Sequence, residues 1–164
     1  MLWHRRQTLG ALSVLFAASA CGFTPAYGPQ GNASVLQNNL RVNAPSRRDG
    51  FLISRRLEDR FGRNDGGRYT LEVNPEIRRQ GLATSVEGTT NRFRLTGFAN
   101  YALRDKETDQ VVRRGRVTKF TGFSATGSTV ATLAAERDAT SRLMVILADD
   151  IVDRLVLSAT GLPA

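Results

Sequence analysis

Histidine, cysteine and tryptophan are almost missing from this chain of 164 residues, which holds one of each. They are His4, Cys21 and Trp3, and all lie near the amino terminus. A lone Cys forms no internal disulfide, and a zinc site needs several Cys or His ligands. Ser-His-Asp and Cys-His catalysis both need a His. We therefore expect no metal, no cofactor and no nucleophilic enzyme.

Lysine is also scarce, because Lys106 and Lys119 are the only two among 23 basic residues, against 15 acidic ones. The planar guanidinium of Arg suits carboxylate and phosphate partners. This charge balance favours anionic surfaces such as phosphorylated lipid head groups, although a GC-rich genome produces the same bias. The content of 41% hydrophobic and 23% charged residues is typical of one soluble folded domain.

The first 20 residues have the pattern of an export signal. Arg5 and Arg6 precede an apolar run from Leu9 to Ala18. A basic start, an apolar run and small residues after it are typical of a signal peptide, and the run is too short for a membrane span of about 20 apolar residues. A buried helix is the alternative, and the sequence leaves the Sec and twin-arginine routes open.

The segment Ala18-Ser19-Ala20-Cys21 resembles a bacterial lipobox, with Ala18 where Leu is usual. We predict that Cys21 becomes the first residue and carries S-diacylglycerol and an N-acyl chain, which together give stable membrane attachment. The Gly- and Pro-rich residues 21–34 would form the lipidated start and a flexible tether. Residues 35–161 would form a single domain. We expect no nucleic-acid partner, because an exported, lipid-anchored protein does not share a compartment with nucleic acid.

The rest of the chain predicts an α+β fold in the order βαβββα. Apolar periodicity predicts strands near 36–42, 69–79, 93–103 and 111–123, and helices near 49–61 and 132–157. Asp49 and Thr132 are the predicted helix caps, and Pro75 indicates a bulge or an edge position. The first two strands should be parallel and the later ones antiparallel. Both helices would pack on one face of a mixed four-stranded sheet.

The other face of that sheet should be polar. On the third strand it holds Arg92, Arg94 and Arg104 and no acidic residue. Three arginines without an acid are unusual for a plain solvated surface. We therefore expect this face to dock a partner or an anionic ligand.

Several segments, taken together, resemble those of a known family. They are Cys21–Gly28, Arg92–Leu95, Ala99–Leu103, Gly115–Val117, Ala131–Ala139 and Leu147–Ile151. The first is common among lipoproteins, whereas the strand and helix segments in this order are more specific. They resemble LptE, the lipopolysaccharide-assembly lipoprotein of Gram-negative bacteria.

This resemblance implies partners and a location. Family members sit inside the outer-membrane β-barrel LptD, as a plug and assembly aid, bind lipopolysaccharide and are not enzymes. We therefore expect an outer-membrane lipoprotein on the periplasmic side, with an LptD-like barrel and lipopolysaccharide as partners. Gly22, in place of an Asp after the lipidated Cys, favours outer-membrane sorting. The alternative is a generic periplasm-facing lipoprotein that binds another envelope component.

The later strands concentrate positive charge. We predict that one basic cluster forms across the hairpin, made of Arg78, Arg79, Arg92 and Arg94. A second basic set on the neighbouring strand is made of Arg113, Arg114, Arg116 and Lys119. Given the resemblance, the hypothesised ligands of these residues are the phosphates of lipid A or the inner core, held by charge-assisted hydrogen bonds. A solvated or barrel-facing set of charges is the alternative.

Two groups of acidic residues are candidates for catalytic sites. No motif surrounds Glu58, Asp59 or Glu72, so a carboxylate-dependent hydrolase is disfavoured. The helical patch of Asp149, Asp150 and Asp153 is better explained by solvated charges or ion pairs.

Overall fold

The structure of the protein, a computed structural model, describes residues 32–84, 90–125 and 128–163. The elements in chain order are η1 (Asn32–Val35), β1 (Leu40–Asn43), α2 (Arg48–Phe61), β2 (Tyr69–Thr84), β3 (Thr90–Asp105), β4 (Val111–Ser124) and α3 (Thr129–Ser158). The expected α+β fold and its βαβββα order are confirmed. The predicted signal peptide and Cys21 lie outside the described residues.

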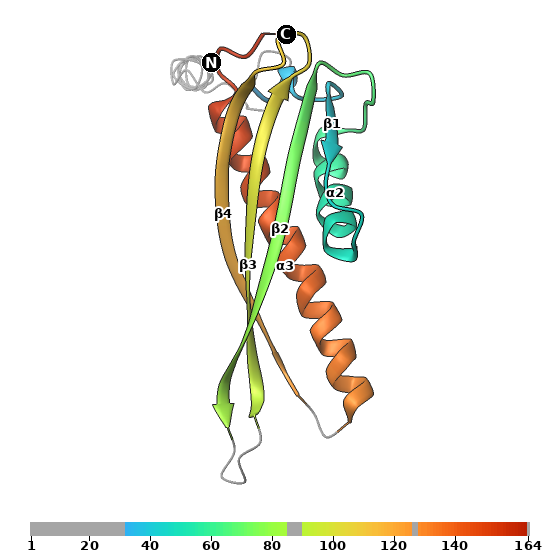
Figure 1. Ribbon diagram of the computed structural model, residues 1–164, viewed down its shortest axis with the longest axis vertical. Coiled ribbons are helices and arrows are strands. Elements are labelled where there is room, and N and C mark those ends of the chain that lie inside the picture. Colours follow the sequence, from blue (N-terminus) through green and yellow to red (C-terminus); the bar gives the residue numbers. More distant parts are fainter. Residues whose placement is uncertain (1–31, 85–89, 126–127, 164) are drawn as a thin grey trace, which may run out of the picture.

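One mixed sheet organises the chain, with strand order β1-β2-β3-β4. β1 pairs parallel to β2, and β2, β3 and β4 form an antiparallel meander. Both helices lie on the same side of this sheet (Figure 1). The parallel pair follows from the crossover through α2, since a helix returns the chain to the same end of the sheet. No helix among the described residues combines the length and apolar character that a membrane crossing needs.

The first strand is shorter than predicted. It begins at Leu40, whereas the sequence suggested a start at Leu36. Leu36 is fully buried but precedes Asn38, which has a φ of 52° and lies in the left-handed region. Asn tolerates that region better than most residues, and a strand cannot pass through it. The apolar pattern therefore predicted the burial of Leu36 correctly, but it wrongly predicted that this residue lies in a strand.

The hairpin between β2 and β3 is longer than predicted. Pairing continues from Arg79↔Leu95 to Thr84↔Thr90, through part of the expected loop, with register shifts after Gly81. Pro75 pairs with Ala99, but β1 has already ended at Asn43. The missing N–H of Pro75 therefore faces no neighbouring strand, which confirms an edge position.

Neither predicted cap residue occupies an N-cap position. Arg47 precedes α2 and Ser128 precedes α3, and neither makes a side-chain capping bond. Asp49 lies in the first turn of α2, where the helix dipole still favours an anion. Thr132 lies inside α3, and its hydroxyl donates to the carbonyl of Ser128 at 3.0 Å. The cap predictions were wrong because each helix starts earlier than its apolar pattern.

The core lies between the sheet and α3. Alternate β3 residues such as Leu95 and Leu103 are buried, as are Leu143 and Leu147 of α3. Gly97 allows the helix to approach, because a Cβ there would lie 2.8 Å from Cδ1 of Leu147. Burying each such Leu stabilises the fold by about 1.5–3 kcal/mol. This packing fixes which side of every strand is left uncovered.

Candidate ligand-binding face of the sheet

The side of β2, β3 and β4 turned away from the helices is called the open face. Side chains alternate across a strand, so even-numbered residues of β2 and β3 lie on this face. Register extends it to β4, where Arg116 pairs with Asn100 and Thr118 with Phe98. The expectation that one sheet face is polar and uncovered by helices therefore agrees with the structure (Figure 1).

The two predicted basic sets are each divided between the two faces of the sheet. The open face carries Arg78, Arg92, Arg94, Arg114 and Arg116. The helix side carries Arg79, Arg113 and Lys119. The expectation that each set shares one surface was wrong for Arg79, Arg113 and Lys119, because adjacent residues of a strand point to opposite faces. Ligand binding by the open-face members stays a prediction.

The basic residues on the helix side have structural partners. The guanidinium carbon of Arg79 lies 4.1 Å from the ring centroid of Phe93, and its Nη1 lies 3.2 Å from Oε2 of Glu136 in α3. Nζ of Lys119 lies 3.2 Å from Oδ2 of Asp150. These contacts tie the strands to α3 and leave these charges poorly placed for a ligand.

Arg113 binds the carboxyl end of α3. Its Nε donates to the carbonyl of Ser158 at 2.8 Å, and its Nη2 donates to that of Thr160 at 3.1 Å. The last carbonyls of a helix have no partner within the helix and favour a cation. Arg113 is therefore a capping residue for α3.

Arginines and phenylalanines alternate on the open face. The ring centroid of Phe98 lies 5.1 Å from the guanidinium carbon of Arg78 and 4.7 Å from that of Arg116. The guanidinium of Arg94 lies 5.3 Å from the ring centroid of Phe120, which is 68% exposed. We call these five residues the Arg-Phe patch. None of its arginines forms an ion pair with another residue that the structure describes.

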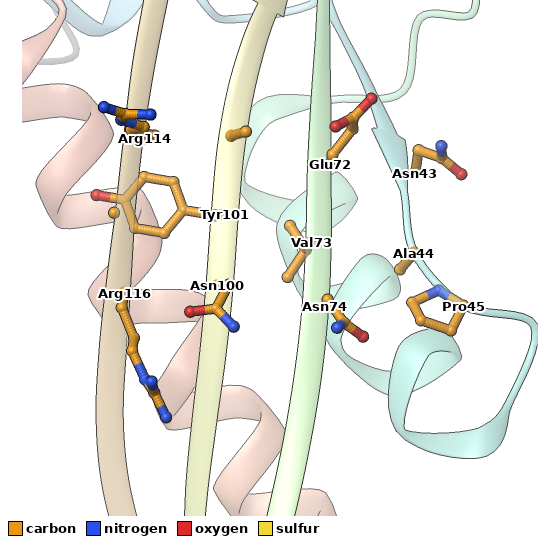
Figure 2. A pocket seen from close by; sticks show the side chains of 12 residues that line it. Asn43, Ala44, Pro45, Glu72, Val73, Asn74, Asn100, Tyr101, Arg114 and Arg116 are labelled. Carbon is orange, nitrogen blue, oxygen red and sulfur yellow. The ribbon is translucent and has the colours of Figure 1, made fainter. Parts of the chain in front are cut away.

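A depression crosses the upper part of the open face and is called the trough. It has a volume of about 920 Å³ and reaches all four strands. Figure 2 shows Arg114 and Arg116 on β4 at one side, and Asn43, Ala44 and Pro45 beyond β2 at the other. The trough could not be predicted from the sequence, because its lining comes together only through strand register.

The upper end of the sheet, at the start of β2 and the end of β3, contains a buried ion pair that the sequence did not predict (Figure 1). Arg68 Nη2 lies 3.0 Å from Oδ2 of Asp105, whose side chain is 2% exposed. The hydrogen bonds from Arg68 hold the pKa of Asp105 below its usual value. Oε2 of Glu107 also lies 3.0 Å from Nη2 of Arg68. This ion pair joins the start of β2 to the end of β3.

In the acidic patch on α3, Asp149 and Asp150 form ion pairs, whereas Asp153 is exposed and forms none with the residues that the structure describes. Asp149 Oδ1 lies 2.9 Å from Nε of Arg56. Burial alone would raise the pKa of Asp150, but hydrogen bonds from Lys119 and Arg154 lower it overall. Within the described ranges, no group of three or more His, Cys, Asp or Glu residues is placed to hold a metal ion.

Solved structures share this fold at low sequence identity. A putative lipoprotein from Caulobacter crescentus is 24% identical, with a TM-score of 0.66 over 81% of this chain and 98% of that one. Rare lipoprotein B from Shewanella oneidensis is 12% identical, with a TM-score of 0.56 over 73% and 94%. A minor lipoprotein from Acinetobacter baumannii is 15% identical, with a TM-score of 0.54 over 72% and 90%.

A search of curated proteins finds no match. The family model of LptE, described as lipopolysaccharide-assembly, matches residues 37–155. That range holds every strand and α2, and most of α3. The chain therefore belongs to the LptE family of non-enzymatic lipoproteins, whose role lies in lipopolysaccharide assembly.

Proposed function

We propose that this protein is the plug and assembly subunit of an LptD-like outer-membrane β-barrel. In this proposal Cys21 carries the lipid anchor, the domain lies on the periplasmic side, and the open face meets lipopolysaccharide. The family and its role in lipopolysaccharide assembly support the setting. The Arg-Phe patch is the single observation that carries the ligand assignment.

The chemistry of the patch suits a phosphorylated lipid. Arg78, Arg94 and Arg116 form no ion pair within the described part of the chain, so their guanidiniums are available for charge-assisted bonds to phosphate. The exposed ring of Phe120 supplies apolar surface beside them. Phosphates and acyl chains occur next to each other in such a lipid, and an arginine beside an exposed ring matches both.

The barrel partner is tested by purification and crosslinking. The full chain, extracted in mild detergent, should co-purify with a large β-barrel protein. A photocrosslinking residue at Thr96, on the open face, should capture either that barrel or lipopolysaccharide in cells. If no barrel protein is recovered, the generic envelope lipoprotein is the better description.

The lipid ligand is tested by charge reversal. Arg78→Glu with Arg94→Glu, in the full chain, should weaken lipopolysaccharide binding at least tenfold, since each lost charged hydrogen bond is worth about 1.5–3 kcal/mol. Arg55→Glu with Arg137→Glu changes the net charge equally on exposed helix positions and serves as the control. Equal affinity of both variants would discard the patch as the binding surface.

A further inference from the structure

We propose that the trough is a binding site for an acidic saccharide, meaning a sugar that carries one carboxylate or phosphate group. This goes beyond the proposed function, because it requires no barrel partner and no lipid. The site also differs in place: it shares only Arg116 with the Arg-Phe patch and extends from there toward β1 (Figure 2).

Register arranges the lining in two rows across the strands. One row is Asn74, Asn100 and Arg116, and the next is Glu72, Ala102 and Arg114. Neighbouring strands are about 4.8 Å apart, so the outer members of a row are about 10 Å apart. Successive rows are two residues apart, or about 6.7 Å. A sugar ring with its substituents fits this spacing.

Ala102 makes room in the middle of the trough. It stands between Glu72 and Arg114 in its row, and its short side chain leaves the space above β3 empty. The long side chains on both sides form rims. A concave surface with few convergent polar groups is typical of small-molecule sites.

The two rims differ in charge. Arg114 and Arg116 form no ion pair within the described ranges, so the β4 rim is cationic. Glu72 makes the β2 rim anionic, and its nearest cation is Nε of Arg104 at 3.8 Å. A ligand with negative charge at both ends would be repelled by Glu72. The trough therefore fits a molecule with an anion at one end and hydrogen-bond donors at the other.

Three side-chain amides lie between or beside the rims: Asn43, Asn74 and Asn100. None donates or accepts a hydrogen bond with another residue in the described part of the chain. Each amide offers donors and an acceptor, and a hydroxyl group can use both. Sugar hydroxyls at the amides and at Glu72, with the acidic group at the arginines, satisfy the whole lining.

A peptide fits this site less well. Extended peptides bind by adding a strand to an open sheet edge. The trough lies on a face, and β3 at its centre is already paired with β2 on one side and with β4 on the other. The side-chain groups alone must therefore recognise the ligand, which favours a compact polar molecule.

The site is tested by nuclear magnetic resonance on the full chain in mild detergent. Glucuronate, galacturonate and glucose 6-phosphate are titrated separately, and the side-chain amide signals of Asn74 and Asn100 are followed. At least one acidic sugar should shift both signals with saturation, and the comparison of carboxylate with phosphate identifies the preferred acid. Neutral glucose should bind at least tenfold more weakly. Equal shifts with inorganic phosphate or triglutamate, or none with the three acidic sugars, would overturn the proposal.

Matched variants place the ligand within the trough. Ala102→Trp fills the middle and Arg114→Gln removes one rim charge, and each should weaken binding of the preferred acidic sugar at least tenfold. Thr96→Trp and Arg94→Gln make the same changes on the open face outside the trough and should leave affinity unchanged. If Ala102→Trp does not fold, Arg114→Gln decides the question, and unchanged affinity in it refutes the site.

The two proposals fail separately. Loss of lipopolysaccharide binding in the Arg78 and Arg94 variant, with the acidic sugar still bound, would separate the patch from the trough. Sugar binding without a co-purified barrel would keep the trough and refute the plug role. Co-purification with a barrel, without any response to the acidic sugars, would support the plug role and refute the trough as a binding site.

Discussion

Arg78 and Arg79 are neighbours in β2, yet they meet different surroundings. Arg79 lies on the helix side, against Phe93 and within 3.2 Å of Glu136. Arg78 lies on the open face, beside Phe98 and without an acidic partner among the described residues. Both contact an aromatic ring, but only Arg79 also joins the sheet to a helix. The position of a charge relative to α3 therefore decides whether it supports the fold or is available to a ligand.

The largest expected effect concerns the packing of α3 on the sheet, which distinguishes the two faces. Leu147→Ala should lower the free energy of unfolding by about 2–5 kcal/mol, because it opens a cavity between α3 and β3. Urea denaturation measures the loss. Ile146→Ala, at a neighbouring position that is 40% exposed, should cost about 1 kcal/mol or less. Similar losses for both variants would mean that α3 is not held by its sheet-facing side.

A second test uses acid. Because the pKa of Asp105 is lowered in the folded state, its contribution to stability is complete above its unfolded pKa of about 3.9. That contribution is lost as the pH falls through the lower, folded pKa. Asp105→Asn should therefore be less stable at neutral pH and lose less stability between pH 4 and pH 2. Thermal melting at several pH values measures both effects.

Glu107→Gln is the matched control for the acid test. Its carboxylate reaches the same Arg68 at 3.0 Å but is 67% exposed. Surface ion pairs contribute little to stability, so this variant should retain more stability at neutral pH than Asp105→Asn. If the two variants behaved alike, the burial of Asp105 would not be the reason for its effect.

The smallest expected effect separates the neighbouring arginines. Arg79→Ala should lower the free energy of unfolding by about 1 kcal/mol, mainly through its lost contact with Phe93, and should leave lipopolysaccharide affinity unchanged. Arg78→Ala should change stability by about 0.5 kcal/mol or less and should weaken lipopolysaccharide binding. Chemical denaturation and a binding titration on both variants decide this. The reverse result would exchange the roles assigned to the two sides of β2.

Sequence reasoning identified the two faces but not the residues that join them. Alternation from Leu95 to Leu103 marks the covered side, because burial removes apolar groups from water wherever the strand lies. Arg79, Arg113 and Lys119 break that alternation. A charge on the covered side becomes evident only when its partner on α3 is known, and that partner is distant in sequence. The same reason explains why the trough was missed.

Local geometry set other limits on the prediction. Asn38 interrupts the apolar pattern that predicted an earlier start of β1. Its left-handed backbone was not predictable, because the position holds no Gly that would indicate it. The sequence analysis assigned no role to Phe120. Its neighbours on the same strand face are polar, and an aromatic residue in that setting indicates an exposed apolar surface for binding. The βαβββα order was predictable because periodicity, turn residues and the crossover rule agree.

The short length of β1 has a consequence for neighbouring molecules. Past Asn43 the outer edge of β2 pairs with no other strand in the part of the chain that the structure describes, and such edges are templates for aggregation. At Pro75 that edge lacks a donor, and its carbonyl already accepts a hydrogen bond from Nη2 of Arg47. A second copy of the chain therefore finds no main-chain donor at this point and a carbonyl that is already engaged. One proline and one arginine make this part of the edge a poor template for growth of the sheet into a polymer.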